Sequence, residues 1–245
     1  MNISEVTVVV PTLNEAETVG HVIDEFQKSG FDTVVIDGKS EDNTQQVAER
    51  AGATIIEQTG SGKGQAVKQA VETYVSTEYF LLVDGDNTYR AEDAEKFFDT
   101  DADQVIGNRF FDLRPGALTP LNKFGNVVVN KLFFLLYQRE LKDILSGFRL
   151  VRTDAFAQMN LSADGFGLET ELAAESVRLN HDVEVVGISY HPRPNGSTSN
   201  LRPLRDGLTI VLTLYCTSAR IRPEVFLGLP IFLLLFLSVI LYTIF

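Results

Sequence analysis

The stretch FLLVDGDNT, residues 80–88, decides the predicted fold of this chain. Its first four residues form an apolar run of the length of a buried strand, which ends in the carboxylates Asp84 and Asp86. In open α/β sheets, ligands bind in the crevice beyond the carboxyl ends of the strands. Paired carboxylates there suit a divalent cation such as Mg²⁺, which takes one or two of them together with phosphate oxygens. The competing interpretation is an acidic turn, since Asp-Gly and Asp-Asn are common turn formers.

Apolar, β-branched runs alternate with helical patterns along the rest of the chain. Strands are expected at residues 6–10, 33–36, 53–56, 80–83, 104–107 and 183–189. Helices are expected at residues 14–30, 44–50, 65–75, 91–98 and 165–179. Strands that alternate with helices through short connections indicate βαβ units. The predicted fold class is therefore α/β, with a mostly parallel, Rossmann-like sheet flanked by helices.

Two further features are compatible with a site for anionic groups. The loop GSGKG, residues 60–64, fails the Walker A pattern because Gly64 follows Lys63 where Ser or Thr is required. The helix that it opens can still present its N-terminus to an anion, and the alternative is a plain flexible loop. Arg109 follows the strand expected at 104–107, and its guanidinium matches phosphate in a bidentate way. The alternative for Arg109 is a surface arginine on a loop.

Composition excludes several classes of protein. The chain has 245 residues, which is enough for one sizeable core with an appendage. Its 33 acidic and 21 basic residues give a net charge of −12, which argues against nucleic-acid binding by a basic face. The one cysteine, Cys216, excludes an intramolecular disulfide and a multi-cysteine metal site.

The hydrophobic pattern of the C-terminal part predicts a membrane anchor. Residues 225–245 contain no charged residue, and about 20 apolar residues suffice to span a bilayer as a helix. We therefore expect a transmembrane helix at 224–245, preceded by a juxtamembrane helix at 203–223. Basic residues precede the apolar stretch, namely Arg202, Arg205, Arg220 and Arg222. By the positive-inside rule they predict a location at the cell membrane, with the preceding domain in the cytoplasm.

Residues 120–138 change the composition within the domain expected at 1–202. Apolar residues dominate this segment, but Lys123, Asn130 and Lys131 interrupt it. An amphipathic helix that lies at the membrane interface, with its basic residues towards the headgroups, fits this pattern. The competing interpretation is a core helix of the domain.

An ordered series of motifs resembles family 2 glycosyltransferases with the GT-A fold. The series is VVVPTLNEAETV from Val8, VVIDGKSEDNT from Val34, GSGKGQAV from Gly60, LLVDGDNTY from Leu81, VIGNRF from Val105, DILSGFR from Asp143 and RPNGSTSN from Arg193. Within the family, the chain is most similar to dolichyl-phosphate sugar synthases. The segments RPGALTPLNKFGN, DILSGFRL, DGFGLETELA and RDGLTI resemble the archaeal type that loads the first hexose for N-glycosylation of S-layer glycoproteins.

The resemblance implies a donor site at the strand ends. Asp84 and Asp86 match the DXD motif, which implies Mg²⁺ or Mn²⁺ held against the donor diphosphate. The residues that match the donor-binding positions are Pro11, Leu13, Glu15, Asp37 and Lys63. Among these, Asp37 is suited to accept a hydrogen bond from a uracil N–H or a ribose hydroxyl.

The resemblance also implies contacts to phosphate groups of donor or acceptor, at Arg109, Arg149 and Arg193. Asp143 is expected to orient a basic partner or a sugar hydroxyl. The chain departs from the family pattern at Gly38, where many relatives carry a second aspartate. It departs again at Asn200, where a lysine is common, and Arg202 is a candidate substitute for that lysine.

The implied activity is inverting transfer of a hexose, glucose from UDP-glucose, to dolichyl phosphate. A phosphomonoester has a second pKa of about 6, so this acceptor needs positioning more than a general base. One alternative is GDP-mannose as the donor. Another is a hydroxyl acceptor on a lipid-linked oligosaccharide or surface polysaccharide, with Asp143 or Glu171 as the base. A third is a membrane scaffold that binds nucleotide sugars without catalysis. The hexose, the metal, the polyprenol length and the oligomeric state stay open.

Overall fold

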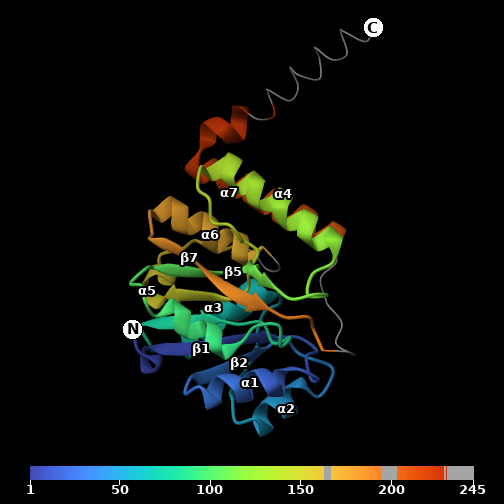
Figure 1. The fold of residues 1–245 in the computed structure, drawn as a ribbon. Helices are drawn as coiled ribbons and strands as arrows, with labels where there is room; N and C mark the ends of the chain where they lie inside the picture. Colours follow the sequence, from blue (N-terminus) through green and yellow to red (C-terminus); the bar gives the residue numbers. More distant parts are fainter. Residues whose placement is uncertain (163–166, 195–202, 229, 231–245) are drawn as a thin grey trace.

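A seven-stranded sheet forms the centre of the protein (Figure 1). The computed structural model describes residues 1–162, 167–194, 203–228 and 230. For residues 203–206 it describes the backbone alone. The strands are β1 (Val6–Thr12), β2 (Asp32–Asp37), β3 (Thr54–Glu57), β4 (Tyr79–Leu82), β5 (Gln104–Leu113), β6 (Arg149–Arg152) and β7 (Val183–Tyr190). Their order across the sheet is β3-β2-β1-β4-β6-β5-β7.

Helices cover the sheet and extend beyond it (Figure 1). The α-helices are α1 (Val19–Lys28), α2 (Thr44–Arg50), α3 (Lys63–Thr73), α4 (Pro120–Tyr137), α5 (Thr153–Ala157), α6 (Leu168–Leu179) and α7 (Pro203–Ile221). Two short 3₁₀ helices, η1 (Ile3–Glu5) and η2 (Ala91–Phe97), complete the elements. The first α-helix begins at Val19, later than the expected residue 14. Asn14 has φ 57° and donates its backbone N–H to Ser40, so it belongs to the loop before the helix.

The expectation of a mostly parallel sheet is confirmed, with one strand reversed. The pairs β1–β2, β2–β3, β1–β4 and β5–β7 are parallel. Strand β6 runs antiparallel to both of its neighbours, β4 and β5. Because β6 begins where β4 ends, with Arg149 opposite Leu82, the loop before β6 lies beside the loop after β4. This reversal brings residues 143–148 to the strand end that carries Asp84.

Alternation along the strands divides the core between the two faces of the sheet. Val8 and Val10 pack on the face covered by α1 and α2, in a cluster that includes Phe26 and Phe148. Val9 and Leu82 pack on the opposite face, among apolar residues of α3, α5 and α6. Successive side chains of a strand point to opposite faces, so an unbroken apolar run predicts a strand that is buried on both.

Helices α4, α6 and α7 enclose a third apolar cluster around Ile106 of β5. Figure 1 shows α4 and α7 side by side at one end of the molecule, away from α1 and α2. One face of α4 is buried through Val129, Phe133 and Leu136. Another face exposes large apolar side chains: Leu121, Phe124, Val127, Val128, Phe134 and Leu135. Helix α4 therefore contributes to the core, as the competing interpretation predicts, and its location at a membrane interface stays a prediction.

The described residues test only part of what is predicted for the C-terminal segment, a juxtamembrane helix followed by a transmembrane helix. A helix is present at Pro203–Ile221, where a helix is expected at 203–223. No helix among the described residues combines the length and the apolar character needed to cross a bilayer. The transmembrane helix expected at 224–245 lies largely outside the described residues, so it stays a prediction.

Candidate functional site

The two carboxylates of the opening stretch lie at the end of β4, near the centre of the sheet. Asp86 is 4% exposed, and its Oδ1 accepts hydrogen bonds from the backbone N–H and the hydroxyl of Thr88, at 3.2 and 2.6 Å. Thr18 donates to the carbonyl of Gly85 between them, at 2.7 Å. The neighbouring strand β1 marks the position where the strand order changes direction, because β2 lies on one side of it and β4 on the other. Such a switch point is the usual ligand crevice of an open α/β sheet.

Lys63 compensates the charge of Asp84. Its Nζ forms ion pairs with both Asp84 and Glu169, the latter from α6. Burial alone lowers the pKa of Lys63, but the two carboxylates outweigh it and raise this pKa above its usual range. The preceding Gly62 has φ 85°, a conformation that glycine adopts at no steric cost. The glycine loop thus brings a lysine to the acidic pair. Sequence reasoning did not identify Glu169, from a distant helix, as the second partner of this lysine.

Arg193 compensates the charge of Asp86. Its Nη2 lies 2.8 Å from Asp86 Oδ2, and its Nη1 lies 3.2 Å from Glu15 Oε1. Burial and the nearby Asp84 raise the pKa of Asp86 in spite of this cation. Burial also acts to raise the pKa of Asp84, but Lys63 overrides it and holds that pKa below its usual range. The structure therefore brings five predicted residues together at one strand end: Glu15, Lys63, Asp84, Asp86 and Arg193.

Arg109 and Asp143 form a buried bidentate ion pair beside this group. Arg109 Nε and Nη2 donate to the two Asp143 oxygens, each at 2.8 Å, and the Arg109 backbone N–H donates to Asp143 Oδ2 at 3.0 Å. Asn126 of α4 accepts from Nη2 at 2.9 Å. The guanidinium carbon lies 5.3 Å from the centre of the Tyr190 ring. Asp143 therefore orients a basic partner, which is one of the two roles considered for it.

Arg149 is predicted to contact phosphate, but the structure directs its guanidinium into the protein. The side chain is fully buried, and burial lowers its pKa to about 10. Its guanidinium donates to the carbonyls of Ser146 and Ile144 and to the side chain of Gln104. These bonds hold the loop before β6 in shape. The structure does not bring Arg149 to the carboxylates as a contact for a ligand.

The predicted nucleotide residues line the adjoining ends of β1 and β2. Asp37 is fully buried, and its oxygens accept four hydrogen bonds, from Thr12, from Gln45 and two from Ser40. A carboxylate has about four acceptor positions, so a nucleotide must replace one of these donors to bind Asp37. Pro11 lies in β1 opposite Ile36, and Leu13 after β1 is 45% exposed. Asn200 and Arg202 lie outside the described residues.

Gly147 allows the loop before β6 to approach Asp84. A Cβ atom at this position would lie 2.3 Å from Asp84 Oδ2. The backbone N–H of Gly147 donates to the hydroxyl of Tyr89 at 3.0 Å. Any larger residue at 147 must displace the Asp84 carboxylate, so this glycine fixes the spacing between the acidic pair and the loop that carries Asp143.

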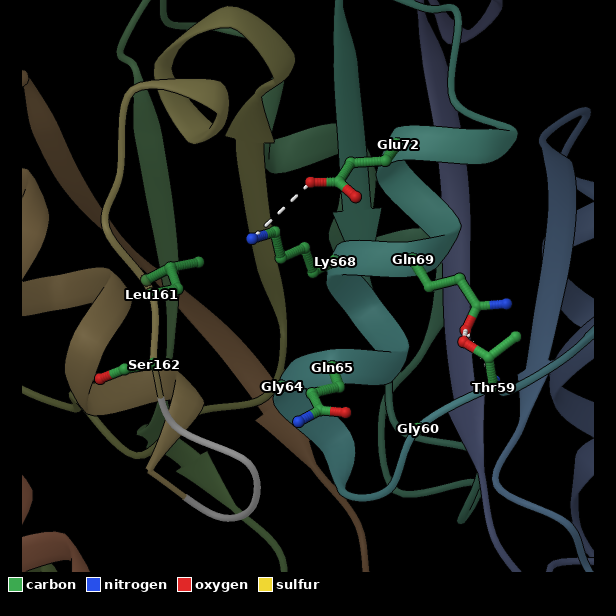
Figure 2. A pocket seen from close by; sticks show the side chains of 9 residues that line it. All are labelled: Thr59, Gly60, Gly64, Gln65, Lys68, Gln69, Glu72, Leu161 and Ser162. Carbon is green, nitrogen blue, oxygen red and sulfur yellow. Dashed lines mark hydrogen bonds and ion pairs between the residues drawn. The ribbon is translucent and has the colours of Figure 1, made fainter.

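A separate hollow lies on the outer side of the glycine loop. Figure 2 shows its walls, formed by one face of α3 and by the segment around Ser162. Its volume is about 530 Å³, and Lys68 and Glu72 on its rim form an ion pair at 3.8 Å. The predicted site residues do not line it, although Gly60 and Gly64 of the same loop do.

The chemistry of Asp84 and Asp86 fits a hard divalent cation. Within the ranges that the structure describes, no three His, Cys, Asp or Glu side chains gather as a complete protein cage for a metal. Mg²⁺ and similar ions need no such cage when substrate phosphates and water supply the remaining ligands. Lys63 and Arg193 stand against the same carboxylates, so the site already accommodates positive charge there.

Comparison with known proteins identifies the family. The model of glycosyl transferase family 2 matches residues 7–159, which includes the acidic pair, Lys63, Arg109 and Asp143. The chain belongs to glycosyl transferase family 2. This glycosyltransferase is 47% identical over 227 residues to glycosyltransferase AglJ of Haloferax volcanii, covering 91% of this chain and 75% of that protein.

Two further comparisons agree with this assignment. A dolichyl-phosphate hexose transferase of Haloferax volcanii is 29% identical over 228 residues, covering 89% of this chain and 96% of that protein. The structure of glucosyl-3-phosphoglycerate synthase from Mycobacterium tuberculosis with Mn²⁺, UDP-glucose and phosphoglyceric acid aligns with a TM-score of 0.67 and 20% identity. That alignment covers 87% of this chain and 79% of the other. It confirms the GT-A-like α/β fold of the glycosyltransferase.

Lys63→Met tests the charge compensation at the acidic pair. The variant leaves Asp84 and Glu169 without their shared cation, so Lys63 no longer opposes the burial that acts to raise the pKa of Asp84. We expect a loss of about 2 kcal/mol in the free energy of unfolding at pH 8, less than for fully buried pairs because Asp84 is partly exposed. Protonation favours the folded variant, so its deficit relative to the wild type should shrink as the pH falls towards about 5.

Urea unfolding at several pH values measures this effect. Lys68→Met is the matched control, because Lys68 lies on the same helix but is 54% exposed in its pair with Glu72. The control should lose less than about 0.5 kcal/mol at every pH. If the loss in the free energy of unfolding of Lys63→Met stays constant or grows as the pH falls, Lys63 does not compensate the charge of Asp84.

Proposed function

We propose that this glycosyltransferase moves glucose from UDP-glucose to dolichyl phosphate, with inversion at the anomeric carbon, at the cytoplasmic side of the cell membrane. In this role it would begin the assembly of a lipid-linked glycan for protein N-glycosylation. The observation that carries the proposal is one strand end where two carboxylates, Asp84 and Asp86, lie beside the cations Lys63 and Arg193. The buried pair of Arg109 and Asp143 adjoins α4, whose outer face is apolar.

The acidic pair is the proposed site of the donor diphosphate. Asp84 and Asp86 would hold Mg²⁺ or Mn²⁺, which when bound neutralises the charge that develops on the leaving nucleotide diphosphate. The structural neighbour of the same fold binds Mn²⁺ and UDP-glucose, which supports this choice of metal and donor. Lys63 and Arg193 would turn from the carboxylates towards the phosphates, because both are long side chains with charges that favour either partner.

Arg109 is the proposed contact for the acceptor phosphate. Asp143 fixes the guanidinium through two parallel hydrogen bonds, so the cation is oriented before the ligand arrives. Asp143 accepts three hydrogen bonds from Arg109, which suits a positioning role better than that of a general base. The relative described as a dolichyl-phosphate hexose transferase supports a lipid phosphate as acceptor.

The reaction needs no proton acceptor when the nucleophile is a phosphate. The acceptor phosphate is largely dianionic near neutral pH, and one of its oxygens attacks the anomeric carbon opposite the leaving group. The bond from that carbon to the diphosphate oxygen breaks as the new bond forms, so the configuration inverts. Arg109 would hold the nucleophile, while Lys63 and Arg193 would stabilise the departing diphosphate.

The apolar face of α4 is the proposed membrane contact. Phe124 is 67% exposed and Phe134 is 50% exposed, and Lys123 and Lys131 are exposed on the same helix. Apolar side chains flanked by lysines are typical of helices that lie in the headgroup region. The transmembrane helix predicted at 224–245 would hold the domain at this surface.

Asp86→Asn tests the proposed reaction. We expect the transfer of labelled glucose from UDP-glucose to dolichyl phosphate to fall by about 10³-fold, because the metal loses a charged ligand and the carboxamide cannot replace it. Chelation of divalent metal should abolish transfer by the wild type. Asp99→Asn, at an exposed aspartate, is the control and should retain full activity. Transfer that persists at wild-type rates in Asp86→Asn contradicts the site, and a product formed only on hydroxyl acceptors contradicts the acceptor.

Gly147→Ala tests the geometry of the donor site. The new Cβ would displace the Asp84 carboxylate, which we expect to weaken binding of UDP with Mn²⁺ by at least about tenfold. The displacement also disturbs the ion pair of Asp84 with Lys63, so the melting temperature should fall, but no further than it does in Lys63→Met. Calorimetric titration measures the binding. Gly125→Ala is the control, because nothing lies within 4 Å of a Cβ at that position, and its affinity should match the wild type.

The double variant Phe124→Glu/Phe134→Glu tests the membrane contact. Burying two carboxylates in the headgroup region is unfavourable, so in a variant that ends at residue 223, and lacks the predicted transmembrane helix, we expect the fraction of protein bound to phosphatidylcholine vesicles to fall at least threefold. Co-sedimentation measures this fraction. His21→Glu, at an exposed position of α1, should bind as the wild type does; Figure 1 shows α1 at the other end of the molecule from α4. Equal binding of the double variant contradicts a contact through α4.

A further inference from the structure

Three elements hold the guanidinium of Arg109. Asp143, from the loop before β6, binds Nε and Nη2, and Tyr190 at the end of β7 lies under the guanidinium carbon. Asn126 of α4 binds Nη2 from a third direction, at 2.9 Å. An arginine has five N–H donors in a rigid plane, so these contacts fix both its position and its rotation.

The remaining nitrogen, Nη1, is left available by this arrangement. Among the described residues, no acceptor receives a hydrogen bond from Nη1. The buried side-chain atoms of these residues that lack a partner belong to other side chains. Asp143 and Asn126 take the N–H groups of Nε and Nη2, and the Arg109 side chain is 9% exposed, so the two N–H groups of Nη1 are left for a further partner. They are the donors that Arg109 can offer to an incoming phosphate.

Asn126 reaches Arg109 from the buried face of α4, whose other buried residues are Val129, Phe133, Leu136 and Tyr137. Its Nδ2 donates to the carbonyl of Asn122 at 2.9 Å, which leaves Oδ1 to accept from Arg109. This orientation of the amide is the required one, because a guanidinium has donors only. Asn126 is 6% exposed, and a buried amide among apolar residues is costly unless its hydrogen bonds are made.

Asn130, one turn further along α4, makes a second connection to the same loop. Its Oδ1 accepts from the backbone N–H of Ile144 at 3.1 Å, and its Nδ2 donates to the carbonyl of Asn126 at 2.8 Å. Helix α4 thus contacts both Arg109 and the residue next to Asp143. Both partners of the ion pair are fixed relative to the helix whose opposite face is apolar and exposed.

We propose that Asn126 is a positioning residue that holds Arg109 for the phosphate of the acceptor and joins the acceptor site to α4. The inference rests on the proposed function for the identity of the acceptor. Without the Asn126 oxygen, one N–H of Nη2 loses its acceptor, and only Asp143 and Tyr190 hold the guanidinium. The donor site depends on Asp84, Asp86, Lys63 and Arg193, none of which hydrogen-bonds Asn126, so the effect should be confined to the acceptor.

Steady-state kinetics of the full chain in phosphatidylcholine vesicles test this inference. For Asn126→Leu, which keeps the size but removes the acceptor atom, we expect KM for dolichyl phosphate to rise about tenfold. KM for UDP-glucose should stay within about twofold of the wild type. An unchanged KM for dolichyl phosphate in Asn126→Leu, or equal increases in both KM values, would overturn the inference.

Phe133→Leu is the matched control for a general disturbance of α4. Phe133 is fully buried on the same helix and stacks on Tyr137 with ring centres 4.5 Å apart, so the variant should lower the melting temperature. It should leave KM for dolichyl phosphate unchanged. If it raises this KM as much as Asn126→Leu does, the effect of Asn126 is packing, and the inference fails.

A measurement without substrate separates the inference from the proposed function. The Nε–H of Arg109, assigned in the nuclear magnetic resonance spectrum of arginine-labelled protein by its loss in Arg109→Lys, should exchange with solvent slowly. We expect faster exchange in Asn126→Leu, and an unchanged rate overturns the positioning role. If the wild type transfers no glucose to dolichyl phosphate, the proposed function fails, while this exchange rate still decides whether Asn126 holds Arg109.

Discussion

Two carboxylates at the end of β4, Asp86 buried and Asp84 partly exposed, require positive charge close by, and much of the structure supplies it. Asp84 and Asp86 are separated by one residue, and each raises the cost of ionising the other. Lys63 from α3 pairs with Asp84, and Arg193 after β7 pairs with Asp86. Glu169 and Glu15 then balance the two cations. The result is a network of alternating charges. A divalent metal and the diphosphate of a nucleotide sugar carry opposite charges, so they can enter together without a change in the net charge of the site.

The reversed strand β6 determines how a second charged group joins this network. Because β6 runs antiparallel between β4 and β5, the loop before it returns to the strand end that carries Asp84. That loop contributes Gly147 against Asp84 and Asp143 against Arg109. Arg149, at the start of β6, uses its donors to hold the carbonyls of the same loop. One buried arginine, Arg149, thus shapes the loop, while the other, Arg109, is held by Asp143 and Asn126.

Helix α4 links this site to an apolar surface. Its buried side carries Asn126 and Asn130 towards the Asp143 loop, and its exposed side carries Phe124 and Phe134. A transferase that joins a water-soluble donor to a lipid needs a polar site for the donor close to an apolar surface for the lipid. The arrangement of α4 provides them on two faces of a single helix, which is why the membrane and the acceptor phosphate are proposed for the same end of the sheet.

Several features followed from the sequence because they depend on neighbours along the chain. The apolar runs predicted the parallel strands, and strands β1, β2 and β4 lie where they were expected. The position of Asp84 and Asp86 at a strand end followed from the abrupt end of one such run. The motifs together led to family 2, which the comparisons confirm. The antiparallel direction of β6 was not predictable, since a short apolar run carries no information on the direction of its pairing.

The sequence by itself determined the α/β fold, the acidic pair at a strand end and the apolar character of α4, because burial patterns are local. Only the tertiary structure decided which charges meet. Lys63 and Glu169 are 106 residues apart, and Arg193 lies 178 residues from Glu15. The burial of Arg149 and the contact of Asn126 with Arg109 also depend on the order of the strands. Ion pairs and hydrogen bonds act over a few ångströms, so their partners are fixed only when distant segments have packed together.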